Sequence, residues 1–426
     1  MIRKISRAAL LVFVAVCCTL ALFSALAPRQ AFADKIFIDI SSPGMRKLPI
    51  AIQPFSGAPE VSDVVKADLT FTGLFECLDD AAQIEQAGQP FNPNNWRGLG
   101  VELVVKGRIT SGLNMLVTAH DAVDGREVLR KEYSASSRGA LRQLAHAVAN
   151  DVYRVLTGRQ GVFRTKIAFI GESGGRKEIY TADWDGYKTG STGISGGVLL
   201  KPRWSPDGSK LIYSSERFRQ WDLFVLDLRT MREKHIRTTR GLTIAGNFFP
   251  DSRRFVFATL YDGNSGIYTG DSVSGQVQKI ASSPWIDVSP AVSPDGKNIA
   301  FVSNRSGGPQ VFLSDASGYN VRRLTYQGGY NTAPAWSPNG DRIAYSGLVG
   351  GQHQIFIMKT DGSGAAQLTD RGNNEEPSFS PDGRYIVFMS DRDGSKGIYL
   401  MRLNGEGQVK ITPRGVKATS PSWSPN

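Results

Sequence analysis

The chain has 426 residues, 41% of them hydrophobic and 21% charged, which is enough for two or three domains that each bury a core. Its formal net charge is +11, but four of the basic residues lie within the first 33. The remaining chain has 46 basic and 39 acidic residues and contains no basic run or basic helix. This small excess of positive charge disfavours nucleic-acid binding. Beyond that segment Cys77 is the only cysteine, which excludes an internal disulfide and a cysteine-based metal site there.

Residues 1–33 have the three parts of a secretory signal peptide. A short basic start is followed by an apolar stretch from Ala8 to Ala27, and Ala31-Phe32-Ala33 offers small residues to a signal peptidase. We therefore expect cleavage after Ala33 and export from the cytoplasm. Two alternatives are an uncleaved membrane anchor, because the stretch is long enough to span a bilayer, and a lipoprotein at Cys17, which the bulky residue before it disfavours.

Residues 34–160 carry no repeat and mix two periodicities. Alternating apolar residues predict strands over 48–54, 101–109, 113–119 and 127–133, whereas helical spacing predicts helices over 61–69 and 140–156. We expect a small α/β domain. At its start, Lys35, Phe37 and Asp39 alternate with Ile36, Ile38 and Ile40, which is a further strand-like pattern.

A repeat built on Ser-Pro-Asp-Gly dominates the rest of the chain. Its prolines stand at positions 206, 250, 294, 338, 381 and 425, a period of 44 residues with one step of 43. Each unit continues with three further β-rich runs separated by Gly-rich or Asp-Gly turns, and no window has helical spacing. Four short strands per 44 residues are typical of a β-propeller blade.

The phase of the repeat predicts how the ring closes. Ile167–Ile170 matches the second strand of a blade, yet no Ser-Pro-Asp turn precedes it. Pro421–Pro425, at the other end of the repeat, matches the missing first strand. The sequence therefore predicts a mainly β protein: a six-bladed β-propeller over residues 161–426, preceded by the small α/β domain.

The predicted strand order sorts the loops onto two faces. The Ser-Pro-Asp-Gly turns share one face, which we call the turn face, with the turns between third and fourth strands. The other loops form the long-loop face, where we expect partner binding. Asp or Asn recurs three residues before a proline in three blades, and turn capping is the alternative explanation for it. The candidate partner-binding residues are Asp287, Asn331, Thr332, Asn374, Glu375 and Glu376.

Enzymatic and metal motifs are weak in this chain. Gly171–Gly175 and Gly193–Gly197 both fit G-x-S-x-G, but each falls in a predicted loop between strands rather than between a strand and a helix. The four histidines are scattered without ligand spacing, and Asp391–Gly394 lacks the later acidic ligands of a calcium loop. A cation in the channel near Asp287 and Glu376 is a weaker possibility. We expect no catalytic residue, no metal and no cofactor.

The Ser-Pro-Asp-Gly repeat with a preceding aromatic resembles the WD40-like repeat of prolyl oligopeptidase relatives, tricorn-type proteases and the TolB family. Six such blades behind a signal peptide and an α/β domain resemble the TolB family in particular. The resemblance implies a periplasmic adaptor of the Tol–Pal system, which supports outer-membrane integrity and constriction at cell division. It further implies that the lipoprotein Pal binds a propeller face and that TolA binds the segment Asp34–Ser42. A glycan-binding propeller, suggested by Trp221, Trp285 and Tyr330, is the main alternative; a propeller hydrolase is a more distant one.

Overall fold

The structure, a computed structural model, describes residues 46–217, 219–238, 241–261 and 264–426. The expected signal peptide and the segment Lys35–Ile40 lie outside these ranges. Within them, no helix combines the length and the apolar composition that crossing a bilayer requires.

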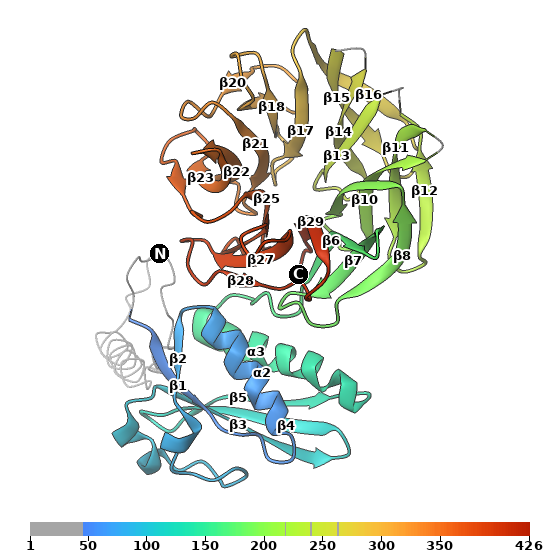
Figure 1. Ribbon diagram of the computed structural model, residues 1–426. Helices are drawn as coiled ribbons and strands as arrows, with labels where there is room; N and C mark the ends of the chain where they lie inside the picture. The colour runs from blue at the N-terminus through green and yellow to red at the C-terminus, as the bar shows by residue number, and fades with distance from the viewer. Residues whose placement is uncertain (1–45, 218, 239–240, 262–263) are drawn as a thin grey trace, which may run out of the picture.

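The first part of the described chain is a five-stranded sheet with two helices (Figure 1). The sheet order is β2-β1-β3-β4-β5, with β1 parallel to both of its neighbours and the remaining pairs antiparallel. The elements are β1 (Leu48–Ile52), α2 (Pro59–Phe71), β2 (Phe75–Cys77), β3 (Leu103–Ser111), β4 (Asn114–Asp121), β5 (Glu127–Ser134) and α3 (Leu141–Thr157), with short 3-10 turns at Asp80–Ala82, Pro93–Asn95, Arg97–Leu99 and Arg138–Ala140.

The expected α/β character is confirmed, and the helices form for the reasons that the sequence indicates. In α3 the apolar residues Leu141, Leu144, Val148 and Val152 recur every three or four positions and are all buried. Gly158, at φ 70°, ends the helix in the left-handed conformation that glycine adopts without a steric penalty. No sequence pattern indicated β2, because three residues are too few to establish an alternation.

The rest of the described chain forms six four-stranded sheets around a central channel (Figure 1), and the predicted six-bladed propeller is confirmed. Blades 1 to 3 are β29 (Lys417–Trp423), β6 (Lys166–Ser173), β7 (Arg176–Asp183), β8 (Gly190–Gly196); β9 (Val198–Trp204), β10 (Lys210–Arg217), β11 (Gln220–Asp227), β12 (Arg232–Ile236); and β13 (Leu242–Phe248), β14 (Arg254–Tyr261), β15 (Asn264–Asp271), β16 (Val277–Ser283). Blades 4 to 6 are β17 (Asp287–Val292), β18 (Asn298–Ser303), β19 (Gln310–Asp315), β20 (Arg322–Arg323); β21 (Asn331–Trp336), β22 (Arg342–Val349), β23 (Gln352–Lys359), β24 (Ala366–Gln367); and β25 (Asn374–Phe379), β26 (Tyr385–Ser390), β27 (Gly397–Arg402), β28 (Val409–Lys410).

The Ser-Pro-Asp-Gly motif forms the turn that joins the first two strands of a blade. In blade 6 the Ser380 hydroxyl donates to Asp382 and accepts from the backbone N–H of Tyr385, at 2.6 and 3.0 Å. Gly383, at φ 72°, completes the turn in a conformation that other residues rarely adopt. The motif therefore recurs because it supplies the polar partners and the glycine that a tight strand-to-strand turn requires.

The last strand of the chain completes blade 1, as the phase of the repeat predicted. β29 pairs antiparallel with β6, from Lys417 opposite Glu172 to Trp423 opposite Ile167. The Trp423 indole is only 5% exposed and donates to the Thr165 hydroxyl at 2.7 Å. Its ring also stacks on Tyr385 of blade 6, so this one side chain links the first blade to the last.

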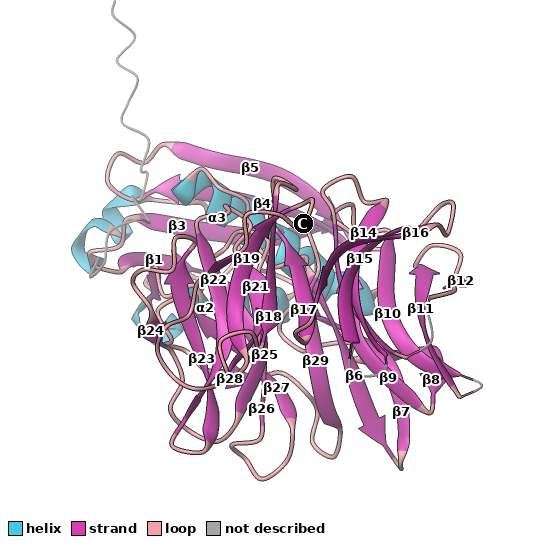
Figure 2. Cartoon of the chain, turned by 90° about the horizontal axis from the view of Figure 1, so that it is seen from above, coloured by secondary structure: helices cyan, strands magenta, loops and turns pink. Residues whose placement is uncertain are grey.

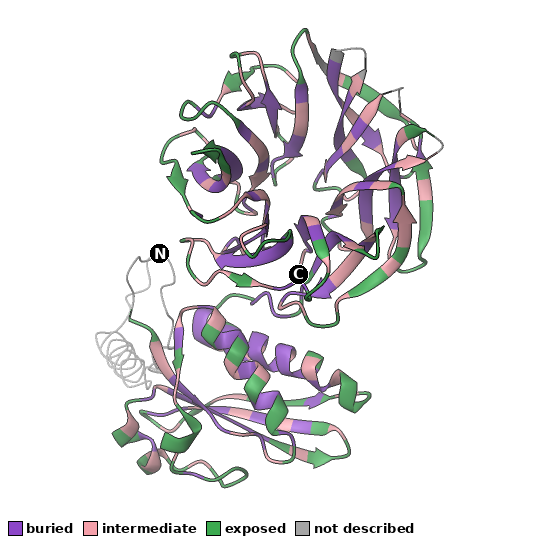
Figure 3. Ribbon diagram, viewed as in Figure 1, coloured by how far each residue is buried: buried purple, intermediate pink, exposed green. Residues whose placement is uncertain are grey.

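The α/β domain packs against the turn face at blades 1 and 6. The Phe71 ring, at the end of α2, lies 5.1 Å from Trp184 and 5.4 Å from Tyr385, centroid to centroid, and all three belong to one continuous apolar core. Figure 2 shows the domain at one end of the propeller strands, and Figure 3 shows that exposed residues concentrate on loops and outer strands. The domain therefore contacts the propeller on the side opposite the long-loop face.

Replacing Trp423 with alanine tests the closure. We expect the free energy of unfolding to fall by about 3–5 kcal/mol, because a large buried ring and its hydrogen bond are lost together. Urea unfolding of the mature protein measures this. Trp221, a partly exposed residue near the start of β11, provides the control, since its replacement by alanine should cost much less. Equal stability of the Trp423→Ala variant and the wild type would mean that the ring does not depend on this strand.

Candidate functional site

The six residues predicted to bind a partner fall into two groups on the long-loop face. Asp287, Asn331 and Asn374 are the first residues of inner strands, and all three are buried. Thr332, Glu375 and Glu376 directly follow two of them and are partly exposed. The structure thus places all six at or beside the starts of the inner strands of blades 4, 5 and 6, and only the second group is partly accessible.

Asn374 links blade 6 to blade 5 through its side-chain amide. Its Nδ2 donates to Gln354 Oε1 and to the Arg371 carbonyl, both at 2.9 Å. Its Oδ1 accepts from the Arg392 guanidinium at 2.7 Å. With these partners the amide is satisfied internally, as expected for a buried polar group.

The same arrangement recurs at the other two positions. Asn331 donates to Gln310 of the preceding blade and to the Gln327 carbonyl, both at 2.8 Å. The Asp287 carboxylate accepts from the Arg305 guanidinium at 3.0 and 3.1 Å and from the Ser283 hydroxyl at 2.7 Å. Asn331 and Asn374 thus cap loop carbonyls, which is the alternative that the sequence left open, whereas the Asp287 carboxylate bonds only side chains.

A glutamine at the start of a third strand was the sequence signal for this link. Gln310 and Gln354 each precede a β-branched residue and a phenylalanine, and each also accepts a hydrogen bond from a threonine hydroxyl in the fourth-strand segment. The pairing of glutamine, threonine and asparagine in two consecutive repeats indicates a link between blades rather than a surface for recognition.

Several exposed apolar side chains lie in the long-loop segments of blades 4 and 5, and we call this set the aromatic patch. Trp285 and Tyr330 are 46% and 41% exposed although both are large rings. The backbone N–H of Leu348 donates to the Tyr330 carbonyl at 2.9 Å, and the Tyr330 ring meets His353 edge-on. The patch therefore rests on a fixed backbone. Its members are Trp285, Ile286, Tyr326, Tyr330, Leu348 and Val349.

Basic side chains lie on the same face over the neighbouring loops of blades 5, 6 and 1. Arg371, Lys396, Arg414 and Lys417 are exposed, and none forms an ion pair with a described residue. We call this group the basic rim. A surface with an apolar centre and unpaired cations beside it is suited to a partner that presents apolar and acidic side chains.

The central channel contains a cavity of about 370 Å³, which is lined by the inner strands of all six blades and extends to prolines of the Ser-Pro-Asp-Gly turns such as Pro206, Pro294 and Pro338. Each inner strand has a bulge in its pairing with the second strand. In five blades the bulge holds a non-glycine residue at φ between 49° and 58°, next to a proline; these residues are Lys201, Ser289, Ala333, Glu376 and Ser420.

The channel is poorly suited to the cation that the sequence left as a possibility. Asp287 does not line the cavity, and the charged side chains that do, among the described residues, are Lys201, Arg203 and Glu376. Burial lowers the pKa of the Lys201 ammonium from its ordinary value, and the nearby charge of Glu376 acts against that shift. Two resident cations against one carboxylate repel a further cation. The sequence did not indicate this, because a strand bulge that aims side chains into a channel has no periodic signature.

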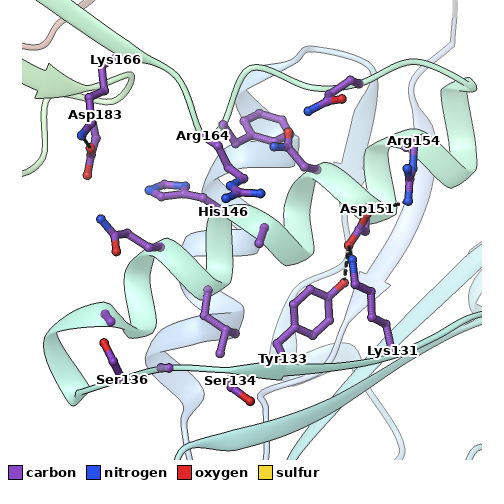
Figure 4. Close-up of a pocket in the computed structure, with 18 residues that line it drawn as sticks. Lys131, Tyr133, Ser134, Ser136, His146, Asp151, Arg154, Arg164, Lys166 and Asp183 are labelled. Atoms are coloured by element: carbon purple, nitrogen blue, oxygen red, sulfur yellow. Dashed lines mark hydrogen bonds and ion pairs between the residues drawn. The ribbon is translucent and has the colours of Figure 1, made fainter. Parts of the chain in front are cut away.

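A second hollow, with a volume of about 760 Å³, lies between α3 and the segment leading into β6 (Figure 4). Most of its charged groups already pair with one another. The Asp151 carboxylate accepts from Lys131, Tyr133 and Arg154 at 2.7–2.9 Å, and Lys166 bonds Asp183 at 2.7 Å. These contacts fix α3 to β5 and order the first propeller strands, so the hollow is part of the domain interface.

Beside that hollow, Asp68, His146 and Asp185 offer three atoms within 4.8 Å of one another, close enough to hold a metal ion. The sequence did not group them, because they come from α2, α3 and a propeller turn. His146 Nδ1 lies 2.7 Å from Asp68, and the Arg142 guanidinium binds Asp185. Burial raises the pKa of Asp68 to about 6, and the hydrogen bond from His146 acts in the opposite direction. The carboxylates thus already have cationic or N–H partners across the domain interface.

The motifs considered for catalysis and calcium serve as turns and strands. Gly171–Gly175 spans the β6–β7 hairpin, and Gly193–Gly197 joins β8 to β9, so a helix follows neither of them. The Asp391 carboxylate accepts from the backbone and side chain of Asn373 at 2.7 and 3.0 Å. These residues therefore stabilise loops.

Two family models match the chain: "TolB amino-terminal domain" over residues 36–125 and "TolB beta propeller domain" over residues 153–426. A curated relative from Anaeromyxobacter dehalogenans, named Tol-Pal system protein TolB, is 33% identical over 286 residues, 63% of this chain and 65% of that protein. One from Bordetella avium with the same name is 31% identical over 259 residues, 59% of this chain and 58% of that protein. These alignments thus span less than two thirds of either relative. A crystal structure of TolB from Acinetobacter baumannii is 26% identical, with a TM-score of 0.82 over 90% of this chain and 98% of that one.

Replacing Asn374 with alanine separates a structural role from recognition. We expect it to lower the free energy of unfolding by about 1–3 kcal/mol, because Gln354 and Arg392 each lose a buried partner. Glu375→Ala, one residue along, should change it by no more than about 0.5 kcal/mol, as at most surface sites. Urea unfolding of both variants measures the difference. An Asn374→Ala variant as stable as the wild type would restore Asn374 as a candidate for direct partner contact.

Proposed function

The chain belongs to the TolB family, and from this membership we propose that it is a periplasmic adaptor of the Tol–Pal envelope system. In this role it binds the lipoprotein Pal through the propeller and TolA through its N-terminal segment. By joining the two it supports outer-membrane integrity and the constriction of the envelope at cell division. The names of the curated relatives support the system, whereas the two partners rest on the family resemblance.

The observation that carries the Pal assignment is the aromatic patch. An exposed group of large apolar side chains on a rigid loop surface is the usual mark of a protein–protein interface, and Trp and Tyr contribute most of the affinity at such sites. We place Pal on the long-loop face, with Trp285 and Tyr330 at the centre of the contact. Thr332, Glu375 and Glu376 lie on the same face and contribute at its margin.

The basic rim extends this proposal to the chemistry of the partner. Unpaired Arg and Lys side chains beside an apolar centre favour a partner with carboxylates around an apolar contact, because opposite charges steer encounter and fix orientation. The buried residues Asp287, Asn331 and Asn374 then act indirectly, by holding the strand starts from which the accessible residues project.

We assign the TolA contact to Lys35, Ile36, Phe37, Ile38, Asp39 and Ile40, which precede the described residues. Their alternation suits addition of a strand to the edge of a partner's sheet, a mode in which backbone hydrogen bonds supply affinity and alternate side chains supply specificity. An ordinary strand of the α/β domain remains the alternative use of the same pattern.

Binding rather than catalysis is the proposed activity. The Ser of each G-x-S-x-G segment lies in a β-hairpin or a strand connection, which does not provide the sharp strand-to-helix turn of a hydrolase nucleophile. A glycan-binding role remains a second candidate, because Trp285 and Tyr330 offer exposed ring faces.

Exposed aromatic residues on the two faces allow a matched test of the Pal site. We expect the double variant Trp285→Ala/Tyr330→Ala to lose about 2–4 kcal/mol of Pal binding in calorimetric titration, the scale of a hot-spot loss. Tyr319→Ala is the control, since Tyr319 is 72% exposed but lies on the turn face. Wild-type affinity in the double variant would refute this placement, and binding of peptidoglycan in the absence of Pal would favour the glycan-binding alternative.

Deletion of Asp34–Ser42 from the mature protein tests the TolA contact. Because the proposed contact uses the segment as a strand that pairs with TolA, we expect TolA binding to be lost in a pull-down while the melting temperature and Pal affinity stay unchanged. A combined Ile36→Asp/Ile38→Asp variant should have the same effect without shortening the chain. If the deletion variant still binds TolA, the assignment is wrong; if its melting temperature falls, the segment is a strand of the domain.

A further inference from the structure

The charge in the central channel is concentrated at one inner strand. Two positions of each inner strand matter here: the residue at the bulge and the second residue after it, such as Lys201 and Arg203 on β9. In all six blades these residues line the cavity, with the single exception of Ser420. Three of them are charged, namely Lys201 and Arg203 on β9 and Glu376 on β25. Two cations two residues apart therefore project into a lumen that is otherwise nearly uncharged. The other positions carry small or neutral side chains: Ala245, Asn247, Ser289, Ala291, Ala333, Ala335, Ser378, Ser420 and Ser422.

Neither cation has a counter-ion. Lys201 Nζ donates to the Ser289 hydroxyl at 3.1 Å, and Arg203 Nη1 donates to the carbonyls of Pro202 and Pro421 at 3.0 and 3.1 Å. No carboxylate oxygen of a described residue lies within 4.0 Å of either side chain. A charge partly withdrawn from water without an ionic partner is unfavourable, and burial accordingly lowers the pKa of both groups.

The Glu376 carboxylate, which also lines the channel, bonds the backbone rather than either cation. Glu376 Oε2 accepts from the backbone N–H of Ser420 at 2.8 Å, which holds it toward blade 1. Its charge acts on Lys201 and Arg203 from a distance and leaves the lumen with one net positive charge. A monoanion brings the net charge of the lumen to zero, whereas a dianion such as sulfate leaves it with one net negative charge.

We propose that the channel is a carboxylate-binding site in which Lys201 and Arg203 together hold one carboxylate group. This goes beyond the adaptor role and does not depend on which protein occupies the long-loop face. Lys201 is the first of the two cations met from that face, because the inner strands begin there. The arginine fork and the lysine ammonium match the two oxygens of a carboxylate.

The walls of the cavity indicate what carries that carboxylate. Pyrrolidine and aromatic rings line it, among them Pro206, Trp204, Pro294 and Trp336, and the volume is about 370 Å³. An aliphatic stem as long as that of a glutamate side chain packs well against such walls. Two sources supply this chemistry: an acidic side chain on a polypeptide, and a small free carboxylic acid.

The test uses a blocked tripeptide, acetyl-Gly-Glu-Gly-amide, whose only charge is one carboxylate. It is titrated into the mature full-length protein at constant ionic strength, beside acetyl-Gly-Gln-Gly-amide, acetate and sulfate, and the melting temperature is followed. We expect a saturable rise in melting temperature with the Glu peptide and none with the Gln peptide. If acetate raises the melting temperature less than the Glu peptide does, the natural ligand is an acidic side chain on a polypeptide. If the two raise it equally, the natural ligand is a free carboxylic acid.

Three variants keep the outcome unambiguous. The double variant Lys201→Ser/Arg203→Ser gives β9 the small residues that other blades carry at these positions, so we expect it to fold. Its apparent affinity for the Glu peptide should decrease at least about tenfold. The charge-matched control is Arg229→Ser/Lys297→Ser on the exposed turn face, which removes one arginine and one lysine and should bind as the wild type does. Glu376→Gln should tighten binding. No response of the wild type, equal binding by the Lys201→Ser/Arg203→Ser variant, or stronger stabilisation by sulfate would overturn the proposal.

Discussion

The antiparallel pairing of β29 with β6 closes the propeller ring. Without it the edge of β6 would be unpaired and the Tyr385 ring would lack Trp423. Closure removes that edge and brings the two ends of the repeat together beside the α/β domain. Because the ring is closed, the inner strands are held at fixed distances, and both the channel and the long-loop surface have defined shapes.

The two faces of the ring have different chemistry because different parts of the repeat form them. In a Ser-Pro-Asp-Gly turn the Ser hydroxyl bonds the Asp carboxylate and a backbone N–H a few residues on, and this compact face accepts the domain through Phe71. On the opposite face the loops are held from below by buried side chains such as Asn374, while Trp285 and Tyr330 stay exposed above them. A rigid base with exposed rings is suited to binding, because little conformational freedom is lost when a partner docks.

The sequence predicted the ring but only part of the site. A period of 44 residues and its phase were enough to predict six blades and their closure, since each repeat must form the same strands. The accessible residue Glu375 and the buried residue Asn374 looked alike in sequence, because burial at a strand start depends on the neighbouring blade. Lys201 and Arg203 were not recognised, because only the bulge in β9 directs them into the channel. His146 and its aspartates meet across a domain interface that no spacing encodes.

We proposed that the closed ring binds Pal on its long-loop face, with the aromatic patch at the centre of the contact. Hydrogen–deuterium exchange of the mature protein, alone and saturated with Pal, tests this most directly. We expect slower exchange on binding in the segments around Trp285, Tyr330 and Leu348, with no change in the Ser-Pro-Asp-Gly turns. Protection of those turns, or of the α/β domain, with the long-loop segments unchanged would contradict it.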